Sequence, residues 1–164
     1  MTPPCGADEP AARVDRRTNR KGRPVATILE VGRQMLSGER ELFPVARLLG
    51  MQMRQIEAGR AVFAMPVDGR QHNPLGTLHG GIYCDLADAA MGWTYAATLG
   101  EGESFTTVEL KINFLRAVRQ GTITAEAKVV KAGSTIGYVE CDVTDQDGRL
   151  VAKASCTCLR LKTG

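Results

Sequence analysis

The chain has 164 residues, of which 43% are hydrophobic, and a formal net charge of +3. A chain of this length and composition suits one domain with a substantial core. Residues 1–24 hold six basic and three acidic side chains, which accounts for the whole net charge and leaves the rest of the chain balanced. We therefore expect a basic, disordered tail over 1–24, one folded domain over 25–164, and no nucleic-acid-binding surface.

The distribution of apolar residues disfavours both a membrane span and secretion. Asp85 and Asp88 interrupt the longest apolar stretch, so it falls short of the roughly 18 residues that a membrane-spanning helix needs. The N-terminal residues carry charges but lack the apolar core of a signal peptide. We expect a cytoplasmic protein with no membrane partner.

The cysteines and histidines argue against a disulfide framework and against a metal site. The five cysteines are an odd number at irregular spacings, and Cys156-Thr157-Cys158 is tighter than a CxxC site. His72 and His79 are the two histidines available as metal ligands. We expect the cysteines to act as small apolar side chains, and we expect no metal site.

Two short helices and a β-hairpin are predicted at the start of the domain. The helices are expected over 25–36 and 41–49, because a glycine follows each of them as a stop signal. Residues 51–57 and 60–67 then predict the hairpin, since apolar and polar residues alternate in its second strand.

A loop followed by a long apolar helix is the most informative segment. Residues 73–81 contain Asn-Pro and three glycines, which break regular structure, and residues 82–99 then supply helix formers that are apolar on nearly all sides. Such a helix is buried, and a carboxylate at Asp88 inside it costs free energy unless it is paired or used. The N–H groups at the start of the helix favour negative charge. Together these features indicate a reaction centre.

Four strands are expected after the helix. Apolar and polar residues alternate over 106–114 and over 122–129, as in half-buried strands. Two further strands follow, one around 139–143 and one over 149–161. Three consecutive strands with short turns imply an antiparallel meander. In the first strand the alternation assigns Thr107 to the polar face. The apolar face consists of Thr106, Val108, Leu110, Ile112 and Phe114. The order predicts an α+β fold whose antiparallel sheet wraps a long central helix.

The order of elements and a short motif carry a family resemblance. The motif is Asn73, five residues, His79-Gly80-Gly81, and then Asp88, an acid nine residues after the histidine. With the apolar helix and the run of strands, it resembles the hot-dog-fold thioesterases of the phenylacetate-pathway (PaaI-like) group, which are related to the Arthrobacter-type 4-hydroxybenzoyl-CoA thioesterases. The resemblance covers roughly residues 42–162. It implies a hot-dog fold and hydrolysis of an acyl- or aryl-CoA thioester to free acid and CoA.

Thioester hydrolysis assigns a role to each motif residue. The Gly80 N–H, at the start of the helix, would polarise the thioester carbonyl. Asp88 would act as general base toward water or as nucleophile, and the resemblance leaves both roles open. We expect Asn73 to contact the carbonyl or the water, and His79 to orient the loop. Thr107 would hold the attacking water, with Thr106 as the alternative if the register slips by one residue.

Gly80 and Asp88 lie eight residues apart on one helix, roughly 12 Å at 1.5 Å per residue, too far apart to flank one carbonyl within a single chain. The resemblance implies a site across a homodimer interface, and dimers that pair into a homotetramer. It implies no cofactor, because coenzyme A arrives as part of the acyl-CoA substrate.

Substrate contacts are expected from several residues outside the catalytic set. Gly81 is expected beside the thioester, and basic residues are candidates for the coenzyme A phosphates: Arg116, Arg119 and Lys131. Many relatives carry a basic residue where this chain has Ser134 after Gly133, so that phosphate contact is absent from its usual position. Three aromatic residues are candidates for an acyl pocket or for core packing: Tyr83, Trp93 and Phe105.

Two other functions remain open from the sequence. One is a non-catalytic acyl-CoA-binding protein of the same fold. The other is a hot-dog hydratase or dehydratase, which is less favoured because residues 68–73 lack the histidine placement and spacing of the hydration motif.

Overall fold

The computed structural model describes residues 26–162, so the expectations for the 1–24 tail lie outside the described residues. The elements follow in the order α1 (Ile28–Ser37), α2 (Pro44–Leu49), β1 (Gln52–Glu57), β2 (Arg60–Val67), α3 (Gly80–Ala96), β3 (Glu103–Phe114), β4 (Gly121–Ala132), β5 (Ile136–Asp145) and β6 (Leu150–Lys162). Within the described part of the chain, no helix is long and apolar enough to cross a membrane.

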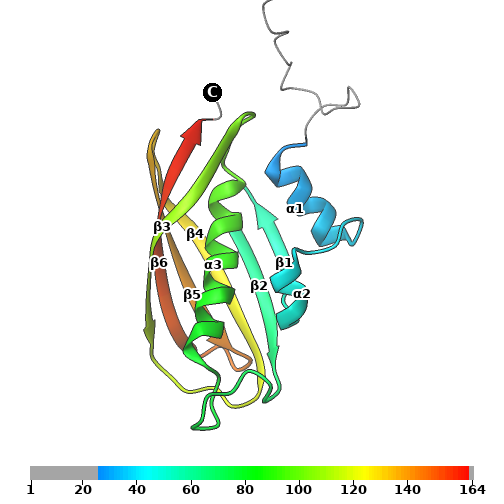
Figure 1. Cartoon of the computed structure of the whole chain (residues 1–164), viewed down its shortest axis with the longest axis vertical. Coiled ribbons are helices and arrows are strands. Elements are labelled where there is room, and N and C mark those ends of the chain that lie inside the picture. The colour runs from blue at the N-terminus through cyan, green and yellow to red at the C-terminus, as the bar shows by residue number, and fades with distance from the viewer. Residues whose placement is uncertain (1–25, 163–164) are drawn as a thin grey trace, which may run out of the picture.

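All six strands form one antiparallel sheet in the order β1-β2-β4-β5-β6-β3. The sheet curves around α3, while α1 and α2 lie over the β1 side (Figure 1). The predicted hairpin, the antiparallel meander and the α+β fold with a wrapped central helix are confirmed. Because β3 pairs with β6 rather than with its neighbours in sequence, β1 and β3 are the two edges of the sheet.

The first two helices begin later than the sequence predicted. Helix α1 begins after Thr27, whose side chain and that of Glu30 form a capping box. Helix α2 begins at Pro44 rather than at residue 41, because proline fits the first position of a helix, where its missing N–H is not needed. Gly50 ends α2 in a left-handed conformation (φ 72°), which fits its predicted role as a stop.

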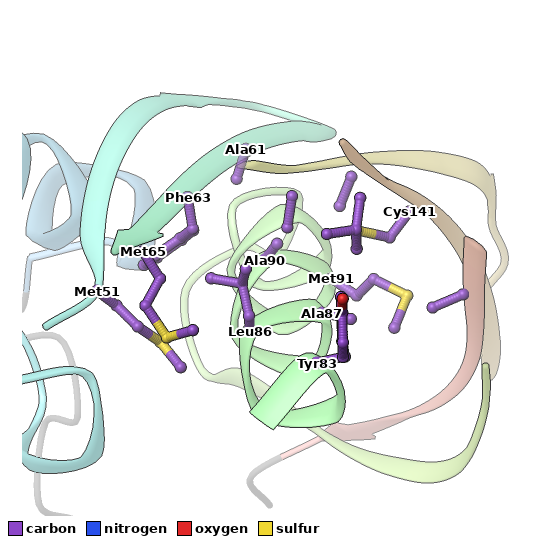
Figure 2. Packing of buried hydrophobic residues seen from close by; sticks show 14 of the residues in the cluster. Met51, Ala61, Phe63, Met65, Tyr83, Leu86, Ala87, Ala90, Met91 and Cys141 are labelled. Carbon is purple, nitrogen blue, oxygen red and sulfur yellow. The ribbon is translucent and has the colours of Figure 1, made fainter. Parts of the chain in front are cut away.

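Helix α3 is the centre of the hydrophobic core. Figure 2 shows Leu86, Ala90 and Met91 of α3 between Phe63 of β2 on one side and Cys141 of β5 on the other. Leu86, Ala90 and Met91 are fully buried. Three cysteines of β5 and β6 are also buried free thiols, as expected for small apolar side chains: Cys141, Cys156 and Cys158.

A β-bulge at Val108 changes the predicted faces of β3. Thr107 pairs with Cys158 and Glu109 pairs with Thr157, so Val108 is an extra residue in β3. The phase of side-chain alternation therefore changes at this point. Val108 is 55% exposed, and Thr107 contacts α3 instead of lying on the polar face. The prediction of one continuous apolar face on this strand was wrong, because alternation assumes an unbroken ladder.

Candidate active site

The start of α3 presents a backbone N–H that has no partner in the part of the chain that the structure describes. His79 is the N-cap residue, and its Nδ1 accepts a hydrogen bond from the Gly81 N–H at 2.9 Å. The next N–H, that of Ile82, donates to the His79 carbonyl. Gly80 is the first helical residue, and its N–H has no acceptor within residues 26–162. It therefore offers one donor at the positive end of the α3 dipole.

The same geometry defines the roles of His79 and Gly81 in this structure. Since His79 Nδ1 accepts a hydrogen bond, it carries no proton, and the ring acts as a helix cap that orients the loop. The Gly81 N–H, which we expected beside the substrate, donates to this ring instead. Of the two glycine N–H groups, the one of Gly80 is therefore the better placed to meet a substrate oxygen.

Hydrogen bonds of Asn73 hold the loop before α3. Its Oδ1 accepts from the N–H groups of Leu75 (2.9 Å) and Thr77 (3.3 Å), and its Nδ2 donates to Thr77 Oγ1 (2.9 Å). Arg119 donates to the carbonyls of Leu75 (3.4 Å) and Gly76 (3.1 Å) from outside the loop. Asn73 and Arg119 thus stabilise the loop, while the second N–H of the Asn73 amide stays available to a ligand.

A pocket of about 350 Å³ with both polar and apolar walls lies at Gly80. Its lining residues come from the loop, from the start of α3 and from the segment after β3: Asn73, Thr77, Leu78, Gly80, Tyr83, Phe114, Leu115, Arg116 and Ala117. A Cβ atom at position 80 would lie 3.1 Å from the Phe114 ring, which explains a glycine at this position. Arg116, one of the basic residues that we expect to contact the coenzyme A phosphates, is exposed and lines this pocket beside Gly80.

Asp88 lies in the middle of α3 beside β3. Its Oδ1 accepts a hydrogen bond from Thr107 Oγ1 at 3.4 Å. The surrounding protein desolvates the carboxyl group and raises its pKa, the Thr107 hydrogen bond lowers it, and the nearby Asp85 carboxylate raises it, with a net rise. The side chain nevertheless keeps access to solvent. Asp88 is therefore a carboxylate with increased basicity that water can reach.

Of the two candidate threonines, the structure brings Thr107 to Asp88. Thr106 is exposed on the other side of β3. The bulge at Val108 explains this choice, because it turns Thr107 inward next to the buried Cys158 of β6.

An apolar groove of about 400 Å³ opens next to Asp88. It lies between α1, α3 and β3 and is lined by Ile28, Val31, Phe43, Asp88, Ala89, Gly92, Trp93, Ala96 and Phe105. Trp93 and Phe105 thus lie where an acyl pocket was expected, whereas Tyr83 belongs to the Gly80 pocket, where its hydroxyl donates to the Arg116 carbonyl at 3.5 Å. The sequence reasoning missed Val31, Phe43 and Gly92. A glycine in the middle of a helix is a signal that could have identified the last of these.

The two halves of the candidate site are separate within one chain. Gly80 and Asp88 line different cavities that share no residue, and α3 runs without interruption between them. Lys131 is also remote from Arg116, because the two residues lie near opposite ends of β4, roughly 30 Å apart at about 3.3 Å per residue. A single chain therefore brings together Asp88 and Thr107, and separately Gly80, Asn73 and Arg116.

Comparisons with known proteins identify the family. A family model described as the thioesterase superfamily matches residues 75–152. The chain is 34% identical over 113 residues to the proofreading thioesterase EntH of Klebsiella pneumoniae, covering 67% of this chain and 77% of that protein. It is 29% identical over 109 residues to the 1,4-dihydroxy-2-naphthoyl-CoA hydrolase of Listeria monocytogenes, covering 66% of this chain and 89% of that protein.

A solved structure agrees with these matches. The PaaI protein from the phenylacetic acid degradation operon of E. coli has a TM-score of 0.72 and 26% identity, covering 82% of this chain and 96% of that chain. The chain belongs to the hot-dog-fold thioesterase superfamily, with PaaI-like proteins among its relatives, and it is a thioester hydrolase.

Proposed function

We propose that this thioesterase hydrolyses an acyl-CoA thioester to free acid and CoA at a site shared by two subunits. The observation that carries the proposal is α3 itself, which holds a Gly80 N–H without an acceptor among the described residues and a carboxylate of raised pKa at Asp88. A coenzyme A thioester is supported by the relative named 1,4-dihydroxy-2-naphthoyl-CoA hydrolase and by Arg116, an exposed cation at the Gly80 pocket.

The Gly80 N–H would stabilise the developing negative charge on the thioester oxygen. Charge grows on that oxygen as the carbonyl carbon becomes tetrahedral, so a fixed donor aimed at it lowers the barrier. The α3 dipole acts in the same direction. Because His79 takes the Gly81 N–H and the Asn73 bonds fix the loop, the donor is held in place before substrate arrives.

Asp88 would supply the other half of the reaction. As general base it removes a proton from water while the water oxygen bonds to the carbonyl carbon; the C–S bond then breaks, and the CoA thiolate leaves and takes up a proton. As nucleophile its carboxylate oxygen would bond to the carbonyl carbon, and the C–S bond would break to release CoA thiolate and leave an anhydride, which water then cleaves to free acid and the Asp88 carboxyl group. Both routes need the ionised carboxyl group. Neither route requires a metal or a cofactor beyond the coenzyme A of the substrate.

The edge strand β3 is the proposed dimer interface. Within the described chain β3 has a strand neighbour on one side, and its exposed apolar residues include Val108 and Phe114, at 55% and 54% exposure. A long edge strand of this kind is a template for pairing with another strand. A second copy of β3 would cover it, in a homodimer that can pair further into a tetramer.

Two-fold pairing of β3 would also complete the active site. Thr107 touches Asp88, and Phe114 touches the Gly80 position. If two β3 strands pair antiparallel about a two-fold axis that passes between Leu110 and Lys111, residue 107 of one chain lies opposite residue 114 of the other. This register brings the Gly80 pocket of one subunit to Asp88 of its partner. The same relation would bring Lys131 of one subunit closer to Arg116 of the other, and both could then bind the phosphates of one coenzyme A.

A cytoplasmic location forms part of the proposal. Four cysteines of the described chain are free thiols, which suits a reducing compartment: Cys84, Cys141, Cys156 and Cys158.

Replacement of Asp88 tests the reactive half. Asp88→Asn keeps the size of the side chain but removes the base, so we expect turnover of aryl- or medium-chain acyl-CoA to fall at least roughly tenfold. Release of free CoA thiol measures turnover, and calorimetry should still detect substrate binding. The variant should fold at least as stably at neutral pH, because it lacks a carboxylate that the fold desolvates. Unchanged turnover would remove Asp88 from the mechanism.

Replacement of Gly80 tests the oxyanion donor. Gly80→Pro removes the N–H, adds a pyrrolidine ring and fits the first helical position, after a His79 backbone that is already extended (φ −66°, ψ 137°). Gly80→Ala is the matched control, since it adds the same Cβ beside Phe114 but keeps the N–H. We expect kcat to be roughly 10²- to 10³-fold lower for the proline variant than for the alanine variant. Equal rates in the two variants would exclude the Gly80 N–H as a donor.

A pH profile tests the contact between Thr107 and Asp88. Activity should disappear as the pH falls through the pKa of Asp88, and Thr107→Val removes the hydrogen bond that lowers this pKa. The acid limb of kcat/KM should therefore move to higher pH in this variant. Thr106→Val changes the exposed residue next to Thr107 and should leave the acid limb of kcat/KM at its wild-type pH. A shift to lower pH, or the same shift in both variants, would contradict the assigned contact.

A further inference from the structure

The two cavities of the site differ in chemistry. The Gly80 pocket has mixed walls, whose polar part includes Asn73, Thr77 and Arg116. The groove beside Asp88 is hydrocarbon apart from the Asp88 carboxyl and the indole N–H of Trp93, and the carboxyl already accepts from Thr107. When the thioester carbon lies within reach of Asp88, the acyl group can therefore bind in the groove. The polar coenzyme A arm then extends toward the Gly80 pocket of the other subunit.

The walls of the groove are fixed by packing before any ligand arrives. The Trp93 ring stacks on Phe43 at a centroid distance of 6.3 Å and an angle of 21°. Gly32 of α1 also lies close to the Trp93 ring, since a Cβ there would lie 3.4 Å from its Cζ3. Phe105 packs edge-on against the buried Tyr95 at 5.5 Å. Rigid apolar walls do not rearrange to supply a hydrogen bond to a polar substituent.

Gly92 forms the part of the groove where α3 and β3 approach each other. A Cβ at this position would lie 3.5 Å from Phe105 Cζ, an ordinary van der Waals contact. A methyl group would therefore fit the folded protein and at the same time occupy groove space. Glycine is a poor helix former, so its presence in the middle of α3 keeps this space open at a cost in helix propensity.

We propose that the groove is the acyl subsite, that it selects an unsubstituted hydrophobic acyl group, and that Gly92 sets its depth. This inference rests on the proposed acyl-CoA thioesterase function and adds the substrate class to it. A hydroxyl group on the acyl moiety would lose its water and find at most the Trp93 N–H as a new partner. Burial of a poorly paired hydroxyl lowers kcat/KM by roughly tenfold or more.

Matched substrate pairs test the selection by polarity. With the wild-type enzyme, kcat/KM for benzoyl-CoA should exceed that for 4-hydroxybenzoyl-CoA by roughly tenfold or more, and octanoyl-CoA should exceed acetyl-CoA. An equal or higher value for the hydroxylated substrate would overturn the inference while leaving the thioesterase function intact. Absence of hydrolysis with every acyl-CoA would instead contradict the proposed function itself.

Variants at Gly92 test the selection by size. Gly92→Ala, and more strongly Gly92→Leu, should lower the ratio of octanoyl-CoA to acetyl-CoA kcat/KM, by roughly tenfold or more for leucine. Circular dichroism checks that both variants fold, and alanine should favour the helix. Gly100→Ala is the matched control, because it makes the same change in an exposed turn outside the groove. A ratio that stays at the wild-type value in both Gly92 variants would show that the acyl group binds elsewhere.

Discussion

The burial of helix α3 inside the curved sheet is the constraint on which the rest of the structure depends. Residues such as Leu86, Ala90 and Met91 are fully enclosed by strands, so the helix cannot bend or shift to bring its own ends together. The Gly80 N–H and the Asp88 carboxylate are therefore held roughly 12 Å apart along one rigid axis. In the proposed mechanism both groups would lie within about 3 Å of the reacting atoms. One chain would then carry one half of each of two sites, and the proposed two-fold dimer would complete both.

The same helix also separates the polar and apolar parts of the site. Its first turn meets the loop that Asn73 organises, where the Gly80 N–H and Arg116 are available. Two turns later Asp88 borders the apolar groove, and desolvation there raises its pKa. Thr107 moderates this rise with its hydrogen bond. The carboxyl group is thus kept basic by the hydrophobic surroundings that also suit an acyl group.

Local patterns predicted the elements of the fold well. The apolar run after residue 81 and the alternating strands identified the helix, the hairpin and the meander, because their spacing follows directly from helix and strand geometry. The motif around His79 also indicated which end of α3 carries the donor. The start of α2 was misplaced because the pattern did not weigh Pro44 as a first helical residue.

Features that depend on tertiary register could not be predicted. The bulge at Val108 turns Thr107 toward Asp88, and it arises from how β3 pairs with β6 rather than from the residues of β3 alone. The use of the Gly81 N–H by His79 depends on the loop conformation. The groove combines α1 and β3 with α3, so its lining follows from packing between segments that are distant in sequence.

Subunit complementation tests the shared site most directly. Asp88→Asn and Gly80→Pro subunits, each inactive alone, are unfolded together and refolded as an equal mixture. A mixed dimer joins the intact Gly80 of one subunit to the intact Asp88 of the other, so the mixture should regain roughly a quarter of wild-type activity by random pairing of two-fold dimers. Recovery of no activity, with mixed dimers demonstrated by mass spectrometry, would contradict a site that two subunits share.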